Sequence, residues 1–168
     1  MLKIKYLILS FSFLIVVSCS VKIENIKDNK NKFSVDYLSG GQGAFIFKNI
    51  LRQQLIANNM YDENSKLIIN IIMTEDENYL STSVTKVASR KLQSLMVRIS
   101  TYNETNKKCI LFNNNYESEQ SFLLADSNAN LSNIAAKDDI FLINSENISL
   151  EVIDDLKVNH GSKCKIIG

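Results

Sequence analysis

Few side chains that could do chemistry stand at useful spacing in this sequence of 168 residues. His160 is the only histidine, and no constellation of nucleophile, base and carboxylate surrounds it. The glycine-rich stretch at 40–43 lacks the Lys-Ser/Thr pair of a phosphate-binding loop. The acidic run at 75–77 lacks the spacing and the glycine of a calcium loop, so we interpret it as a solvated turn. We therefore expect no enzyme, no metal site and no cofactor.

Cys19 is the residue whose surroundings do indicate a reaction. Lys3 and Lys5 precede an apolar run that ends just before it, an arrangement typical of a signal peptide that is removed. The run is too short for a stable membrane span of roughly 20 residues. Residues 16–19 (Val-Val-Ser-Cys) resemble the bacterial lipobox, in which the cysteine thiol receives a diacylglycerol and becomes the new N-terminus. We predict a signal peptide over residues 1–18 and lipidation of Cys19.

Ser20 and the charge balance bear on where the anchored chain resides and what it binds. In such lipoproteins an aspartate after the cysteine favours the inner membrane, so Ser20 favours the outer membrane, on its periplasmic face. Removal of residues 1–18 takes away two of 19 basic side chains and none of 18 acidic ones, which leaves a net charge of −1. No basic run interleaves with aromatic residues, so we expect no nucleic-acid partner.

Cys109 and Cys164 remain once lipidation has used the first cysteine. In an oxidising compartment this even pair could form a disulfide that ties the C-terminal tail to the body of the protein. Two unpaired thiols are the alternative. The distance between the two α-carbons decides between them, because beyond about 7 Å no bond forms without movement.

Hydrophobic periodicity divides the first half of the mature chain into a tether and three elements. Residues 19–31 are polar and charged without sustained periodicity, as in a lipidated tether. Apolar residues alternate over 33–37, which predicts a strand, and recur at helical spacing over 43–59. Residues 67–73 alternate again with apolar residues on both faces, so we expect a central strand covered on both sides.

The second half predicts a hairpin followed by a helix. Residues 79–89 carry β-prone residues without a burial pattern and are interpreted as a hairpin flank. Strands over 95–101 and 109–116 enclose a polar turn, and 121–130 is interpreted as a loop. A helical stripe then runs over 134–156.

The final helix carries two further predictions. Ser132 suits an N-cap, and the poor helix formers at 144–147 suggest a break. The resulting order is β-α-β-β-β-α. It predicts an α+β domain over 32–159, with two helices packed on one face of a four-stranded mostly antiparallel sheet, followed by a tail over 160–168.

Two local stretches carry a resemblance to a known family. The stretch at 47–59 contains an arginine, a glutamine pair, a leucine and an asparagine in helical order. Residues 88–102, the strand ending at 116–122 and the segment Ala-Ala-Lys-Asp-Asp at 135–139 form the second stretch. Together with the lipobox and the element order, they resemble the LPS-assembly lipoprotein family LptE, also called RlpB.

The resemblance implies a non-enzymatic function. Members of that family sit inside the β-barrel protein LptD at the outer membrane, assist its assembly and contact lipopolysaccharide. Lys137 falls at the family's lysine where the second helix starts, and Lys86 and Arg90 lie near its other basic position. The resemblance therefore implies that these three residues contact lipid phosphates, with solvated surface charge as the alternative. The C-terminal tail has no counterpart in the family pattern.

Two further functions remain open from the sequence. One is an accessory lipoprotein of an inner-membrane lipid-transport complex, which membrane fractionation would separate from an outer-membrane protein. The other is a surface lipoprotein that binds another protein through a sheet edge formed by residues 79–89. Protease treatment of intact cells would cleave such a surface protein but not an internal plug.

Overall fold

The computed structural model describes residues 32–82, 89–124, 130–159 and 165–166. Five strands and two helices follow one another in this described part of the chain. They are β1 (Ser34–Ser39), α2 (Gly41–Ala57), β2 (Leu67–Thr82), β3 (Ser89–Asn103), β4 (Asn106–Leu123), α3 (Asn130–Val158) and β5 (Lys165–Ile166). Within these residues, no helix is both long and apolar enough to cross a membrane.

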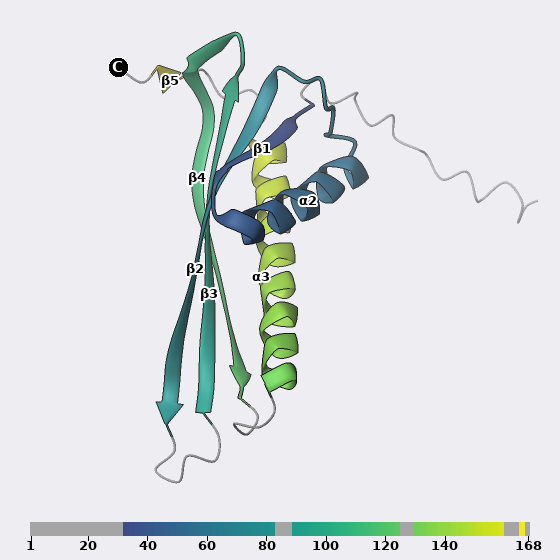
Figure 1. Ribbon diagram of the computed structural model, residues 1–168. Helices are drawn as coiled ribbons and strands as arrows, with labels where there is room; N and C mark the ends of the chain where they lie inside the picture. Colours follow the sequence, from purple (N-terminus) through teal and green to yellow (C-terminus); the bar gives the residue numbers. More distant parts are fainter. Residues whose placement is uncertain (1–31, 83–88, 125–129, 160–164, 167–168) are drawn as a thin grey trace, which may run out of the picture.

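The strands form one sheet in the order β1-β2-β3-β4-β5. β1 runs parallel to β2, and every other neighbouring pair is antiparallel. Both helices lie on the same side of this sheet, and α3 extends along most of its length (Figure 1). The predicted α+β architecture with two helices on one face is therefore confirmed, and the tail adds a short fifth strand that was not predicted.

The hydrophobic core fills the space between the helices and the inner face of the sheet. Alternation along β2 and β3 directs every second side chain towards the helices, where it is buried. The helices contribute side chains three or four residues apart, which share one face of each helix. The principal core residues are Phe47, Leu51, Leu55, Ile69, Ile71, Leu95, Val97, Ile99, Ile148, Val152, Ile153 and Leu156.

Gly40 makes the tight connection between β1 and α2 possible. Its φ of 119° is unfavourable for any residue with a side chain. A β-carbon here would also lie 2.8 Å from the β-carbon of Ala44 and 2.9 Å from that of Met73. The glycine thus lets the start of α2 pack directly against β2.

The strands are longer than their apolar patterns predicted. β2 continues beyond residue 73 to Thr82, and β4 continues to Leu123, inside the predicted loop at 121–130. The acidic run at 75–77 pairs with β3 at Leu95, Ser94 and Gln93, so its interpretation as a solvated turn is wrong. Backbone hydrogen bonds between strands continue this far although the side chains are charged, because the ladder does not depend on apolar side chains.

Helix α3 also differs from its prediction. It is continuous over 29 residues, so the predicted break at 144–147 is wrong. It begins at Asn130, which places Ser132 inside the helix and not at its N-cap. Asn144 and Ser145 are fully buried, and the Asn144 side chain bonds to the sheet. These tertiary contacts outweigh the low helix propensity of the segment.

Neither of the two described helices lies on the outer face of the sheet (Figure 1). Ile68 and Ile72 on β2 point to this face and are partly exposed, so the prediction that this strand is covered on both sides is wrong. Antiparallel sheets commonly bury one face and leave the other to solvent.

Candidate functional site

The inner face of β2 changes character along its length. Ile69, Ile71 and Met73 are buried in the core, and Glu75 and Glu77 continue the same alternation. Both carboxylates therefore face α3, whose Lys137 lies within ion-pair distance of them. A strand that is apolar at one end thus becomes acidic at the other.

The neighbouring elements bring cations to these carboxylates. Lys91 on β3 pairs across the ladder with Tyr79 and points to the inner face. Lys137 on α3 precedes Phe141 by four residues and Asn144 by seven, so it lies on the helix face turned towards the sheet. Two acids and two lysines from three different elements therefore meet beneath the first half of α3.

These four side chains form a network of ion pairs. Lys137 contacts Glu77 directly and lies 3.4 Å from a carboxylate oxygen of Glu75. Lys91 donates to the other oxygen of Glu77 at 2.9 Å. Gln93 donates to Glu75 at 2.7 Å. Glu77 therefore bridges the two lysines, whereas Glu75 also binds Gln93. Gln93, Ser118 and Asn144 are joined by hydrogen bonds under α3, and we call them the polar layer.

The network stabilises the charged form of its members. The hydrogen bond from Lys137 lowers the pKa of Glu77, although partial burial opposes that change. The same hydrogen bond raises the pKa of Lys137, and the bond from Lys91 to Glu77 raises the pKa of Lys91. All three groups are therefore charged at neutral pH, and with Glu75 the cluster carries two charges of each sign.

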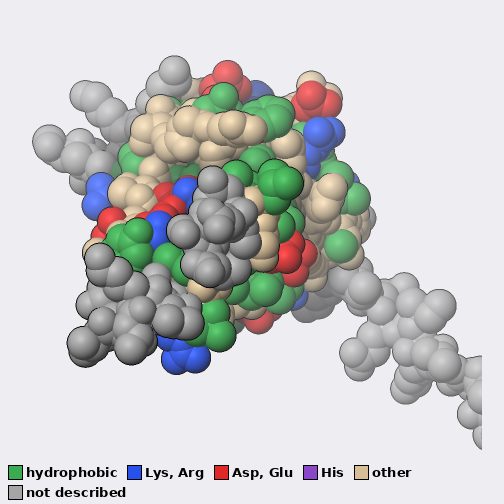
Figure 2. Space-filling view, turned by 60° about the horizontal axis from the view of Figure 1, so that its bottom comes forward, with side chains coloured by type: hydrophobic (Ala, Val, Ile, Leu, Met, Phe, Trp, Pro, Cys, Tyr) green, Lys and Arg blue, Asp and Glu red, His purple; other side chains and the backbone are tan. Residues whose placement is uncertain are grey.

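A cleft of about 290 Å³ opens beside this network. Its lining combines charged and apolar side chains, namely Glu77, Lys91, Phe122, Leu124, Asn133, Ile134 and Lys137. Figure 2, which looks towards this end of the molecule, shows acidic and basic side chains side by side with hydrophobic side chains around them. We call this feature the lysine cleft.

Exposed apolar side chains surround the lysine cleft. Ile134 at its rim is 57% exposed, and Leu131, one turn earlier on α3, is 84% exposed. Tyr79 on β2, whose ring lies under the ammonium of Lys91, is 63% exposed. Large apolar side chains gathered at one end of a domain mark a surface for a protein or a lipid. Ammonium groups beside them suit an amphiphile with an anionic head.

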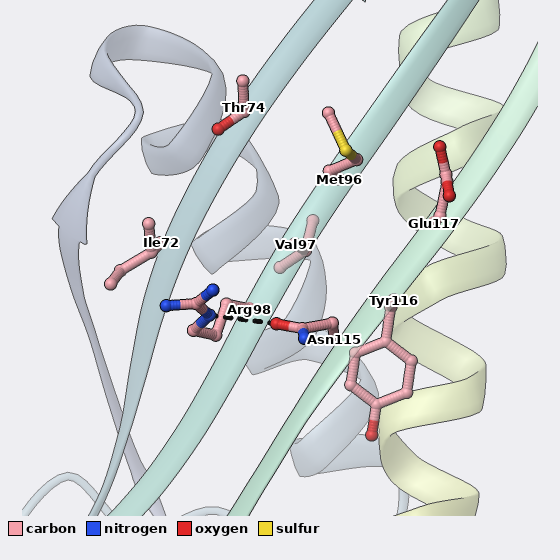
Figure 3. A pocket seen from close by; sticks show the side chains of 8 residues that line it. All are labelled: Ile72, Thr74, Met96, Val97, Arg98, Asn115, Tyr116 and Glu117. Atoms are coloured by element: carbon pink, nitrogen blue, oxygen red, sulfur yellow. Dashed lines mark hydrogen bonds between the residues drawn. The ribbon is translucent and has the colours of Figure 1, made fainter.

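A second hollow, of about 450 Å³, lies on the outer face of the sheet. Figure 3 shows that Ile72, Met96 and Arg98 point out of this face, while Tyr116 points to the helices. The guanidinium of Arg98 donates to Asn115 at 2.9 Å. Neither Arg90 nor Lys137, the two described residues among the predicted lipid contacts, lines this hollow, so it is not the candidate site.

The structure places two of the three predicted lipid-contact residues, and these two lie apart. Lys137 lines the lysine cleft, whereas Lys86 lies outside the described residues. Arg90 is exposed and precedes Lys91 by one residue, so alternation directs it to the opposite face of the sheet. Sequence reasoning missed Lys91, Glu75 and Glu77. All three stand at every second position counted from the core residues of β2 and β3, which indicates that they face the helices as the core residues do.

The remaining predicted sites lie mostly outside the described part of the chain. Cys19, His160 and Cys164 belong to segments that the structure leaves out. Cys109 is buried and disulfide-bonded, and Ile166 of β5 pairs with it across the ladder. The pairing of Cys109 with Cys164 stays a prediction. Among the described residues, no group of three histidine, cysteine or acidic side chains is placed to hold a metal ion.

Known proteins were compared with this chain by sequence and by structure, and only the structural comparison finds matches. No protein family model and no curated protein sequence matches the chain. Its structure does match a minor lipoprotein from Acinetobacter baumannii, with a TM-score of 0.62 and 14% identity over 80% of this chain and 96% of the other. It also matches rare lipoprotein B from Shewanella oneidensis, with a TM-score of 0.56 and 12% identity over 77% and 98%.

The chain shares its fold with bacterial lipoproteins. At these identities the likeness establishes the fold, and it agrees with the resemblance to the RlpB family found in the sequence. Since almost the full length of each neighbour is covered, the shared part is the whole domain and not one motif.

Proposed function

We propose that this protein is an outer-membrane lipoprotein, anchored on the periplasmic face through Cys19. In this proposal it partners an LptD-like β-barrel in lipopolysaccharide assembly and transport, as a plug and as an assembly factor. The observation that carries the proposal is the lysine cleft, in which two ammonium groups lie beside apolar side chains. The cleft stands in a fold shared with rare lipoprotein B.

The lysine cleft matches the chemistry of lipopolysaccharide or a related lipid. Lys91 and Lys137 provide donors for phosphate oxygens, and such charge-assisted hydrogen bonds are stronger than neutral ones. Phe122, Leu124 and Ile134 provide an apolar surface next to them for acyl chains. A site that only balanced charge would not need apolar side chains in its wall.

The shape of the domain supports the role of a plug. The sheet is long and narrow, and both described helices lie on its inner face (Figure 1). That face carries both polar and apolar side chains, among them Arg98, Asn115 and the 41% exposed Met96. A surface of this mixed composition suits contact with the polar interior wall of a large barrel.

Binding of a partner through a sheet edge has less support. Three amides on strands β1, β2 and β4 are each bonded by the side chain of the residue before them. The bonds run from Tyr37 to Asp36 at 2.8 Å, from Glu77 to Asp76 at 3.0 Å and from Asn115 to Asn114 at 3.0 Å. Amides satisfied in this way are less available to an added strand.

Co-purification tests the proposed partnership. The full chain, carrying a C-terminal tag, is extracted from outer membranes with mild detergent and captured. We expect a large β-barrel protein to remain bound through high-salt washes, identified by its mass and by its heat-dependent migration. A chain that purifies alone in every salt and detergent condition would contradict the proposal, and recovery in the inner-membrane fraction would favour an inner-membrane transport complex.

Mass spectrometry of the mature N-terminus tests the anchor separately. We expect the first peptide to begin at Cys19 and to carry acyl chains. A Cys19→Ala variant is the control and should lose both processing at this site and membrane attachment. A bare Cys19 or an intact Met1 in the wild-type protein would refute lipidation.

A further inference from the structure

The two lysines of the lysine cleft already hold anions that belong to the chain itself. Lys137 contacts Glu77 and lies 3.4 Å from Glu75, and Lys91 donates to Glu77 at 2.9 Å. These carboxylate oxygens use the ammonium donors that the phosphate oxygens of a lipid would need. The positive charges of Lys91 and Lys137 are therefore balanced by carboxylates of the chain itself.

We infer that Glu77 is an internal competitor for the lipid phosphate: it holds Lys91 and Lys137 in the lipid-free protein and is displaced when an anionic lipid binds. This inference rests on the proposed function, because it concerns the regulation of the same cleft. Its consequence is selectivity. Only a headgroup that binds the lysines better than a carboxylate does can enter.

The contacts of the two acids distinguish Glu77 from Glu75. Glu77 bridges both lysines and lines the cleft. Glu75 reaches only Lys137 and also accepts a hydrogen bond from the fully buried Gln93. Release of Glu77 therefore frees Lys91 and leaves Lys137 with the more distant Glu75, which is itself held by Gln93. The Glu77 side chain is 24% exposed, so it can turn towards solvent after release.

The strength of the contacts fits a displaceable group. A partly exposed ion pair changes an equilibrium constant by roughly 1.4-fold to fivefold. Since Glu77 makes two such pairs, its removal should tighten binding of an anionic lipid by about twofold to 25-fold. A phosphate monoester carries about −1.5 to −2 charge at neutral pH, against −1 for the carboxylate, so it can win this competition.

The test measures the affinity of the full chain, purified in detergent, for lipid A. We expect Glu77→Gln to tighten binding by about twofold to 25-fold and Glu75→Gln to tighten it less. Lys137→Gln should weaken binding. Glu63→Gln is the matched control for lost negative charge, because Glu63 precedes β2 while the cleft begins about ten residues, or roughly 33 Å, into that strand. Lys157→Gln is the control for lost positive charge on α3.

Two further ligands identify the group that Glu77 opposes. Dephosphorylated lipid A should show no gain with Glu77→Gln, because it has no phosphate to take the place of the carboxylate. Inorganic phosphate alone should show little binding to either protein. If inorganic phosphate binds and Glu77→Gln tightens its binding as much as that of lipid A, Glu77 does compete with phosphate. The ligand of the cleft is then a free phosphate and not a lipid headgroup.

The outcomes separate this inference from the function on which it rests. If Lys137→Gln weakens lipid A binding while Glu77→Gln and Glu75→Gln leave it unchanged, the competitor is refuted and lipid contact stands. If neither the wild-type protein nor Glu77→Gln binds lipid A, the competitor and lipid handling both fail, whereas the barrel partnership is still decided by co-purification. Thermal unfolding verifies that each variant is folded. If Glu77→Gln does not fold, the competition is tested with Glu75→Gln alone.

Discussion

Replacement of Asn144 by alanine tests the polar layer that holds the first half of α3 on the sheet. Its side chain is fully buried. It accepts a hydrogen bond from Ser118 at 2.8 Å and donates one to the backbone carbonyl of Gln93 at 3.3 Å. Each buried hydrogen bond contributes about 1 kcal/mol, and a buried partner left without a bond adds a desolvation cost. We expect Asn144→Ala to lower the free energy of unfolding by about 2–3 kcal/mol.

The control is the same substitution at Asn115, on the outer face of the sheet. Asn115 is exposed and its side chain accepts a hydrogen bond from the exposed Arg98, so Asn115→Ala should change the free energy of unfolding by less than about 0.5 kcal/mol. Urea unfolding followed by circular dichroism measures both variants. With an m-value of about 2 kcal/mol/M, the midpoint should fall by about 1 M for Asn144→Ala and by about 0.2 M for the control.

A double-mutant cycle with Ser118→Ala makes the test sharper. Ser118 and Asn144 share one hydrogen bond, so the double variant should cost about 1 kcal/mol less than the sum of the single variants. Equal midpoints for the two asparagine variants, or strict additivity in the cycle, would refute the claim that this polar layer fastens α3.

Two further predictions concern Gly40 and Glu77. Gly40→Ala should destabilise the fold by more than about 2 kcal/mol and Gly41→Ala by about 1 kcal/mol. Both glycines have positive φ, but only at Gly40 is there no room for a β-carbon. Equal thermal unfolding midpoints for the two variants would contradict this. The stability difference between the wild type and Glu77→Gln should be constant near neutral pH. It should shrink on acidification below the ordinary pKa of a glutamate, because the hydrogen bond from Lys137 lowers the pKa of Glu77 in the folded protein and this stabilisation is lost as Glu77 protonates. It should also shrink in strong alkali, because the same hydrogen bond raises the pKa of Lys137 and is lost when Lys137 gives up its proton. Urea unfolding across this range measures it, and a difference that grows on acidification would contradict the network.

The sequence allowed the element order to be predicted because apolar residues recur at two distinct periods. It did not allow the ends of the strands to be predicted, because a strand is recognised in a sequence by alternating apolar residues. β2 instead carries Glu75 and Glu77 where its inner face meets α3. The alternation itself was preserved from Met73 onward. The regular alternation of inward-facing and outward-facing residues, and not their hydrophobicity, therefore indicates how far the strand extends.

The candidate site was only partly accessible from sequence. Lys137 was found by resemblance, and it does line the cleft. Its partner in the cleft is Lys91 and not the adjacent Arg90, because a shift of one residue in a strand moves a side chain to the other face. The register of β3 against its neighbours decides that face, and this register depends on contacts far apart in the sequence.

The lengths of the elements explain why the cleft can be polar. At 1.5 Å per residue, α2 spans about 25 Å and α3 about 43 Å, whereas β2 extends to roughly 50 Å. Two helices therefore cover one part of the sheet, where the apolar core forms, and α3 alone covers the rest. The second part can hold ion pairs and a cleft without weakening the core, because Ile148, Val152 and Leu156 anchor the same helix further along. Substitutions at Lys91 or Lys137 should consequently change ligand binding far more than thermal stability.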